Sequence, residues 1–323
     1  MLKPTTILAL VGFAIFVPSL LTPPIALGLQ AEMGRFGSSP GSFIKPVGLA
    51  VDEDGNVFVV DVVNATLQKF EAENQLVSWQ FKDATLMFVA VDSEDHIYIT
   101  DASCDCVHKS YRGRNFSSQW GSEGKGNGQF RDPAGLAADD GYVFVVDSKN
   151  HRIQKFSSDG EFIAKWGSFG KENGNFAFPA GIALDEEGNL YVADTGNHRV
   201  QKFTGNGYFL AAWGNKGTRE GEFDRPTDVT LNQEGHIYVV DSGNHRVQVF
   251  DGDGDYISEW GQKGSGRREF RTPLCIAVNE EDLSVYVSDS GNSRVQRVPG
   301  GGDASDPSNT TWGDLKDTFR KGP

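Results

Sequence analysis

The stretch FPAGIALDEEGNLYVADTGNHRVQKF, residues 178–203, contains the pattern that decides the fold. Gly181 to Leu184 and Leu190 to Ala193 are apolar segments of strand length, and Glu187-Gly188-Asn189 between them has the composition of a tight hairpin turn. The second segment contains no polar residue, as expected of a strand that is covered on both faces. It ends at Asp194, and a further strand follows directly, which indicates consecutive antiparallel strands.

The same pattern recurs six times along the chain. In each copy an aspartate ends an apolar strand, and these aspartates are separated by 40, 46, 47, 47 and 48 residues: Asp61, Asp101, Asp147, Asp194, Asp241 and Asp289. The alternating apolar residues Phe162, Ala164 and Trp166 show that a copy also has a fourth strand. Four strands in a repeat of this length are typical of a propeller blade. The predicted fold is therefore all-β, a six-bladed β-propeller with four antiparallel strands per blade.

The ring is predicted to be closed by the N-terminal strand. Phe36-Gly37 lies 25 residues before Asp61, much as Trp120-Gly121 lies 27 residues before Asp147. The segment that ends at Phe36 is therefore expected to be the outer strand of the last blade, where it removes an exposed sheet edge. The competing segment, Thr310 to Leu315, is expected to belong to a short C-terminal helix instead.

The first thirty residues are predicted to direct export. Lys3 precedes the uncharged run Ile7 to Val17, and small residues occur up to Gly28, which together are typical of a secretory signal peptide over residues 1–28. The alternative is an uncleaved anchor, although Pro18 interrupts the roughly 20 apolar residues that a membrane span needs. The expected localisation is secreted, or else membrane-anchored and facing outside.

The remaining chain divides into a propeller over residues 29–300 and a C-terminal tail over residues 301–323. Three Asn-X-Ser/Thr triplets are compatible with export and are candidate glycosylation sites: Asn64, Asn115 and Asn309. The net charge of −14 disfavours binding to nucleic acid or to an anionic membrane, because both favour an excess of Lys and Arg. A monomer is expected.

The turn that follows the aspartate identifies a family. Asn150-His151-Arg152, Asn197-His198-Arg199 and Asn244-His245-Arg246 resemble the signature of NHL repeats, as does the Gly-rich linker Gly124 to Phe130. The resemblance covers about residues 30 to 300. It implies a six-bladed propeller that usually binds a protein, RNA or another ligand, and it does not imply one particular activity.

Repeated Asp and Arg residues are predicted to stabilise the blades rather than to catalyse a reaction. The aspartate ends one strand and the arginine begins the next, so their side chains can pair across the turn. A single active site would not need the four copies that the chain contains, which are Asp147 with Arg152, Asp194 with Arg199, Asp241 with Arg246, and Asp289 with Arg294.

The loops are expected on two faces of different charge, because propeller strands alternate in direction. The hairpin turns between the first and second strands, here called the hairpin face, contain fifteen acidic residues and no Lys or Arg. The long linkers between blades, here called the linker face, contain ten basic and seven acidic residues. An anionic or mixed-charge protein, peptide or glycan is the expected partner, and the candidate contact residues are Lys125, Lys171, Arg219, Arg267, Arg268 and Arg271.

Two departures from the repeat are expected on the linker face. In the second blade Cys104 and Cys106 occupy the positions of Asn and Arg, and an extended strand would point them and His108 the same way. They form a candidate soft-metal site, although a Cys104–Cys106 disulfide is the preferred interpretation in an exported protein. At the channel mouth Asp228 and Cys275 are candidate binding residues, since other blades have a glycine at this position: Gly48, Gly135 and Gly181.

A binding scaffold without a cofactor is predicted, and not an enzyme. The alternative is a metal-dependent propeller enzyme of the amidating-lyase or lactonase type, with its metal at the channel mouth. Amidating lyases resemble these repeats but carry metal-binding histidines after the proline that opens the inner strand, whereas the corresponding residues here are Val47, Phe88, Ala134, Ala180, Thr227 and Leu274. Lactonase-type propellers hold a calcium ion with Glu, Asn and Asp residues of the inner strands, and only Asp228 is a candidate for such a ligand here. A ubiquitin-ligase role would need a zinc-binding RING domain, which three cysteines cannot build.

Overall fold

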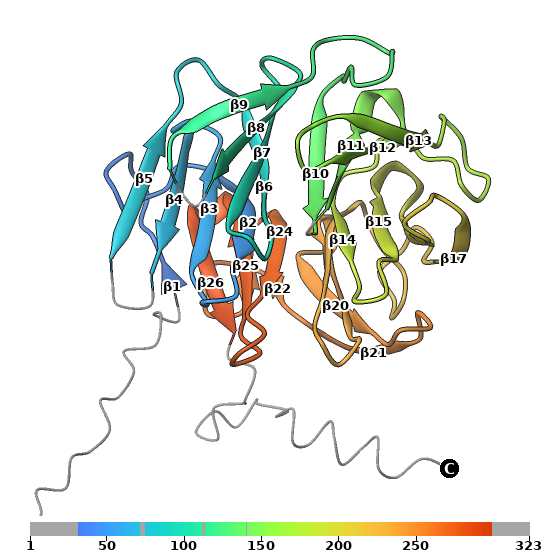
Figure 1. Cartoon of the computed structure of the whole chain (residues 1–323). Helices are drawn as coiled ribbons and strands as arrows, with labels where there is room; N and C mark the ends of the chain where they lie inside the picture. The colour runs from blue at the N-terminus through green and yellow to red at the C-terminus, as the bar shows by residue number, and fades with distance from the viewer. Residues whose placement is uncertain (1–31, 72–74, 112–113, 140, 299–323) are drawn as a thin grey trace, which may run out of the picture.

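The computed structural model describes residues 32–71, 75–111, 114–139 and 141–298. These residues form six four-stranded antiparallel sheets that surround a common axis (Figure 1). The predicted all-β, six-bladed propeller is therefore confirmed. No helix within these ranges is long and apolar enough to cross a membrane. The predicted signal peptide, the C-terminal tail with its helix and Asn309 lie outside the described residues.

Each blade begins with its inner strand and ends with its outer strand. Blade one contains β2 (Pro46–Val51), β3 (Val57–Asp61), β4 (Thr66–Phe70) and β5 (Leu76–Gln80). Blade two contains β6 (Leu86–Val91), β7 (His96–Asp101), β8 (Cys106–Tyr111) and β9 (Phe116–Trp120). Blade three contains β10 (Pro133–Ala138), β11 (Tyr142–Asp147), β12 (Arg152–Ser157) and β13 (Phe162–Trp166).

The second half of the ring repeats this order. Blade four contains β14 (Ile182–Leu184), β15 (Leu190–Asp194), β16 (Arg199–Phe203) and β17 (Phe209–Trp213). Blade five contains β18 (Pro226–Leu231), β19 (Ile237–Asp241), β20 (Arg246–Phe250) and β21 (Tyr256–Trp260). Blade six contains β24 (Pro273–Val278), β25 (Val285–Asp289), β26 (Arg294–Val298) and β1 (Glu32–Met33), and the linker before it contains the short parallel pair β22 (Gln262–Lys263) and β23 (Glu269–Phe270).

The N-terminal strand closes the ring as predicted. β1 pairs with β26 through Met33 opposite Val295, and it is the outermost strand of the sixth sheet. The Met33 side chain is buried in the core cluster shared by blades six and one. Glu32 also accepts a hydrogen bond of 2.8 Å from Arg294. Closure thus joins the two ends of the repeat region by backbone pairing, apolar packing and an ion pair.

Apolar packing between neighbouring sheets forms the core. The second strands are buried along their whole length, as in β15 and β19, apart from Tyr142 at the start of β11, because a neighbouring blade covers each of their faces. Every linker that has a Gly-rich loop ends in a fully buried phenylalanine, and in blade five this residue, Phe223, packs against Phe250 with ring centroids 5.6 Å apart. Gly214 has no Cβ atom that would collide with the Phe223 ring. The linkers are therefore fixed to the blades that follow them.

Candidate functional site

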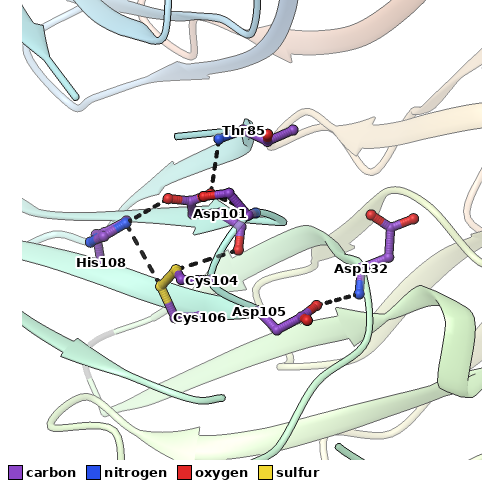
Figure 2. The surroundings of a disulfide bond; sticks show 8 residues. Thr85, Asp101, Cys104, Asp105, Cys106, His108 and Asp132 are labelled. Carbon is purple, nitrogen blue, oxygen red and sulfur yellow. Dashed lines mark hydrogen bonds and ion pairs between the residues drawn. A yellow bond between two sulfur atoms is a disulfide. The ribbon is translucent and has the colours of Figure 1, made fainter. Parts of the chain in front are cut away.

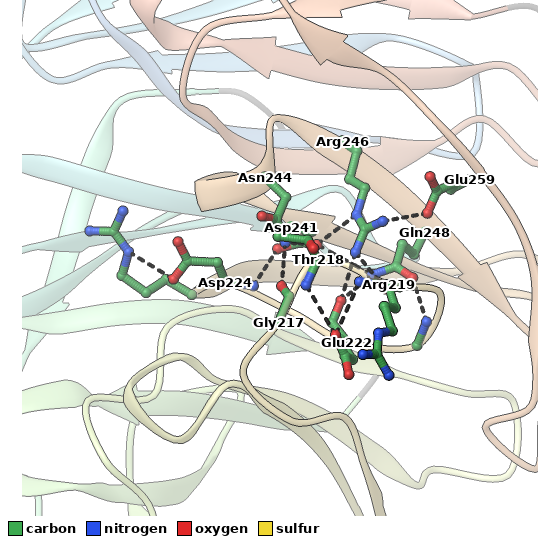
Figure 3. A network of polar contacts seen from close by, with 12 residues as sticks. Gly217, Thr218, Arg219, Glu222, Asp224, Asp241, Asn244, Arg246, Gln248 and Glu259 are labelled. Carbon is green, nitrogen blue, oxygen red and sulfur yellow. Dashed lines mark hydrogen bonds and ion pairs between the residues drawn. The ribbon is translucent and has the colours of Figure 1, made fainter.

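The predicted Asp–Arg pairs form a larger network, which is shown for blade five in Figure 3. Asp241 is fully buried, and its Oδ2 atom accepts hydrogen bonds from Arg246 Nε at 2.8 Å and from Asn244 Nδ2 at 2.8 Å. The outer nitrogen of Arg246 donates to the carbonyl oxygens of Arg219 and Glu222 in the preceding linker. The pair therefore holds the linker against the blade, which is the structural role that its repetition predicted.

A fourth member of this network was not recognised in the sequence. Gln248 lies seven residues after Asp241, donates to its carboxylate and accepts a hydrogen bond from Gly221 N in the linker. The equivalent glutamines of blades three, four and six also donate to their aspartates: Gln154, Gln201 and Gln296. A glutamine at this fixed spacing recurs in the sequence and could have revealed it. We call the set of Asp, Asn, Arg and Gln the four-residue clip.

Blade two contains the aspartate of the clip but none of its usual donors. Cys104 and Cys106 form a disulfide, so the preferred interpretation of these residues is confirmed (Figure 2). His108 Nε2 lies 3.1 Å from Asp101 Oδ2. Although burial raises the pKa of Asp101, hydrogen bonds from His108 and Ser103 lower it to about 2. Asp101 is therefore a carboxylate at neutral pH.

The inner strands meet in a ring of residues that we call the inner column, which consists of Gly48, Phe88, Gly135, Gly181, Asp228 and Cys275. The register of β6 corrects one prediction: Leu86 pairs with Asp101 as Pro46 pairs with Asp61, so Phe88 belongs to this column and Met87 takes the position assigned to it in the sequence. The short linker before blade two lacks the proline that marks the start elsewhere, and this caused the one-residue error. Met87, like the residue assigned there from the sequence, is not one of the histidines that bind metal in amidating lyases.

The glycines of the inner column allow neighbouring inner strands to touch. Gly135 N donates to Ala180 O at 2.8 Å, and Gly181 N donates to Thr227 O at 2.9 Å. In the next two blades, side chains make the connection instead. Asp228 Oδ2 accepts Ile276 N at 2.9 Å, and Cys275 Sγ accepts Leu49 N at 3.1 Å.

Phe88 fills the middle of the inner column. Its side chain packs against the core clusters of blades three and four and of blades six and one, as well as that of blades two and three. Because these clusters lie on different sides of the ring, the phenyl ring reaches across the axis. The channel is thereby narrowed at the level of the inner column.

A central cavity of about 370 Å³ lies on one side of this column. Its walls follow all six inner strands from the column toward their hairpin turns, with apolar side chains such as Leu136 and Ile182. Asp228 and Cys275 line its inner end, and Glu280 lies toward the hairpin turns. The cavity therefore opens toward the acidic hairpin face, whereas the sequence placed these two residues on the linker face. The cavity opens to this face because the inner strands touch one another at the inner column, which leaves the open space on the hairpin side.

Burial raises the pKa of both side chains at the inner end of the cavity. Desolvation raises the pKa of Asp228 to about 7, against the lowering effect of hydrogen bonds from Cys275 and from the Ile276 and Val229 amides. Desolvation and the neighbouring Asp228 also raise the pKa of Cys275 well above its ordinary value. At neutral pH the carboxyl group can both take and release a proton, while Cys275 remains a thiol.

The cavity does not fit a resident divalent metal of the lyase or lactonase type. It offers the carboxylate of Asp228 and the neutral thiol of Cys275 at its inner end and Glu280 toward the hairpin turns, and an inner-strand histidine is absent from its lining. Among the residues that the structure describes, only the blade-two cluster brings at least three possible metal ligands within 4.8 Å of one another. The lining of the cavity therefore supplies too few ligands for a metal at the channel mouth.

The predicted basic residues lie on the linkers, around the other face. Arg268 is half-buried, and its backbone amide donates to Gln296 of the clip. The other five side chains are exposed: Lys125, Lys171, Arg219, Arg267 and Arg271. Of the two candidate glycosylation sites within the described residues, Asn115 is exposed. The Asn64 side-chain nitrogen donates to Gly37 O and to Asp61. Asn115 is therefore the more accessible acceptor.

The fold and the repeated four-residue clip define a repeat propeller of six blades. The NHL repeat, as a sequence family, matches residues 43–70, 130–156, 176–203, 223–250 and 270–298, which are blade one and blades three to six. The chain therefore belongs to the NHL-repeat family of six-bladed β-propellers. No curated protein matches it significantly.

Several solved structures share the fold. A streptogramin B lyase is 16% identical with a TM-score of 0.60, over 83% of this chain and 97% of the lyase. A gluconolactonase from Xanthomonas campestris is 16% identical with a TM-score of 0.60, over 80% of this chain and 86% of that one. Regucalcin from Agrobacterium tumefaciens, described as a calcium-binding protein, is 15% identical with a TM-score of 0.59, over 84% and 94%.

These similarities correct the prediction that the chain is not an enzyme. Solved propellers that share its fold over most of their length are described as a lyase and a gluconolactonase. The prediction was based on the absence of inner-strand histidines, which argues against one metal chemistry and leaves metal-independent catalysis open. At these identities the likeness concerns the fold, so the activity has to be argued from the cavity itself.

Proposed function

We propose that the chain is a propeller enzyme of the lyase or lactonase type that cleaves a cyclic ester without a resident metal. Its substrate enters the central cavity from the hairpin face, and Asp228 transfers the proton. The observation that carries this proposal is a buried carboxyl group at the inner end of a cavity, with a pKa raised to about 7. A general acid or base is most effective when its pKa is close to the working pH.

The geometry supports Asp228 as the acid–base group. The Ile276 amide fixes one carboxylate oxygen, and Gly181 provides the space that the other oxygen fills. Removal of a proton next to a carbonyl starts an elimination, and removal of a proton from water starts a hydrolysis, so one base serves either reaction. Cys275 is excluded as the nucleophile because its raised pKa keeps it a thiol, and the thiolate is the reactive form.

The cavity also indicates the kind of substrate. Its volume of about 370 Å³ lies within the range of small-molecule sites. Leu136 and Ile182 give it apolar walls, while acidic turns surround its opening. A neutral or cationic compound with an apolar ring fits this combination better than an anionic one.

The test is turnover of two ester classes, simple lactones and a streptogramin B depsipeptide, by the purified chain in excess chelator. We expect turnover of one class, with a rate that rises with pH through an apparent pKa near 7 because the ionised form is the base. Asp228→Asn should lower the rate by roughly 10²- to 10⁴-fold. Arg271→Glu, on the exposed linker face, should leave it unchanged. Absence of turnover for both classes, or full turnover by Asp228→Asn, would refute the proposal.

The exposed basic residues of the linker face support a second and independent proposal, that this face binds an anionic glycan or protein. Arg267 and Arg271 lie in the same linker, and both are exposed. Retention on immobilised heparin at low salt tests this, with elution expected at clearly lower salt for the variant Arg267→Glu/Arg271→Glu. Equal elution of the two proteins would argue against a binding role of this linker.

A further inference from the structure

Three departures from the repeat converge on one carboxylate in blade two. In blades three to six the buried aspartate accepts hydrogen bonds from an Asn, an Arg and a Gln at fixed spacings. In blade two the same three positions are Cys104, Cys106 and His108, around Asp101. Each hydrogen-bond donor of the clip has been replaced by a side chain that can bind a soft or borderline metal ion.

The four side chains already have nearly the spacing of a metal site. One ligand atom of each lies within 4.8 Å of those of the others. His108 Nε2 is 3.1 Å from Asp101 Oδ2 and 3.8 Å from Cys106 Sγ. In a tetrahedral zinc site with the usual bond lengths, ligand atoms are separated by roughly 3.3 to 3.8 Å. The two sulfur atoms, now bonded to each other, would have to move apart.

The cluster is held in place by hydrogen bonds to Asp101 and is exposed to solvent at Cys104. Asp101 is held by the Thr85 amide (Figure 2). It is also held by the amide and hydroxyl of Ser103, so its position does not depend on the disulfide. Cys104 is exposed. The long linkers before other blades fold back on themselves through a bridge between two of their residues, such as Phe169 and Phe176. The linker before blade two, between β5 and β6, is short and has no such bridge among its described residues. Cys106 is buried, so a reductant and a metal ion can reach the cluster from the side of Cys104.

We propose that Asp101, Cys104, Cys106 and His108 form a redox-gated site for a borderline-soft divalent cation of the Zn²⁺ type. With the disulfide formed, both sulfur atoms are used and the site is closed. Two electrons and two protons from a dithiol convert the disulfide into two thiols, and the dithiol becomes a disulfide. The bound cation then takes the place of the two thiol protons, which are released. The metal replaces the clip that blades three to six make with Arg and Gln.

The test uses the full chain, reduced with a phosphine, freed of reductant under nitrogen and titrated with Co²⁺ as a spectroscopic substitute for Zn²⁺. We expect one equivalent of Co²⁺ to bind, with thiolate-to-cobalt charge-transfer absorption that Zn²⁺ abolishes. The oxidised chain should show no such absorption. His108→Gln, which restores the residue of the other blades, should weaken binding by more than the roughly 10- to 100-fold that second-shell partners contribute.

Two matched variants establish whether the absorption comes from this cluster. Cys275→Ser should keep the absorption, because that thiol is buried in the inner column. The triple variant Cys104→Asn/Cys106→Arg/His108→Gln rebuilds the clip, and it should fold and show no absorption. Thermal melts provide a second measurement, in which Zn²⁺ raises the Tm of the reduced chain and leaves that of the oxidised chain unchanged. Absorption that survives Cys106→Ser, or a Tm that Zn²⁺ does not raise in the reduced chain, would overturn the proposal.

Discussion

The carboxylate of Asp228 in blade five occupies the space beside Gly181 in blade four where a Cβ atom would have to lie. The two residues are 47 positions apart in the sequence, and they touch because their inner strands approach closely at the inner column. A glycine is therefore required at position 181, because the Asp228 carboxylate leaves no room for a side chain. Substitutions at this contact, and at the other contacts that hold the ring, should change stability in specific ways.

Gly181→Ala should destabilise the chain by about 1–3 kcal/mol, since the added methyl group would displace a buried carboxylate that cannot move without losing its bond to Ile276. Urea denaturation measures the effect. Gly141→Ala is the matched control, because no atom lies within 4 Å of the Cβ position at Gly141, and it should change stability little. An equal effect of the two substitutions would contradict the packing described for the inner column.

Asp228 should make stability fall as the pH rises from about 4 to about 7. Its folded-state pKa is raised to about 7 from 3.8, so the folded chain holds the proton more tightly than the unfolded chain over this interval. The resulting loss is on the order of 4 kcal/mol and is complete above pH 7. Asp228→Asn mimics the neutral form and should not show this decline. Unfolding free energies at pH 4.5 and 7.5 test it, and an identical pH dependence in both proteins would exclude the raised pKa.

Arg246→Ala should cost about 3–5 kcal/mol, because it leaves the fully buried Asp241 without its guanidinium partner and releases two linker carbonyls. The control is Lys149→Ala. Lys149 forms an ion pair with Asp132 in which the side chains are 61% and 39% exposed, and such pairs contribute about 0–1 kcal/mol. Thermal melts of the two variants should differ clearly, and a similar small effect of both would mean that the clip does not stabilise the blade.

Met33→Ala should lower the free energy of unfolding by about 2–5 kcal/mol, since it removes the buried side chain by which the N-terminal strand packs on the last blade. Val63→Ala, at a side chain that is 56% exposed, should change it by less than about 0.5 kcal/mol. Chemical denaturation of both variants measures the contribution of ring closure. A loss no greater than that of the control would show that β1 does not contribute to stability.

The architecture could be predicted because its causes are local and repeated. Each aspartate ends a buried strand and precedes a turn, so the spacing of Asp61 to Asp289 counts the blades without any knowledge of long-range contacts. The N-terminal closing strand followed from the same spacing. The disulfide of Cys104 and Cys106 could also be predicted, because both residues belong to one turn and the predicted export favours oxidation of nearby thiols.

Where the repeat weakens, sequence reasoning was wrong by one residue. Blade two lacks the opening proline, and Phe88 was assigned one position too early on the inner strand. A shift of one residue moves a strand side chain to the opposite face, so the residue that crosses the channel axis could not be recognised. Only the pairing of Leu86 with Asp101 settles the register.

The sequence by itself determined the number of blades, their closure and the pairs that stabilise them, because these depend on residues close together in the chain or repeated at a fixed spacing. The tertiary structure alone decided where the central cavity opens and how acidic Asp228 is. Both depend on contacts between different blades: Phe88 narrows the channel from blade two, and Gly181 and Ile276 enclose the Asp228 carboxylate from either side. Desolvation by these neighbours raises its pKa, and no local pattern records how closely they approach.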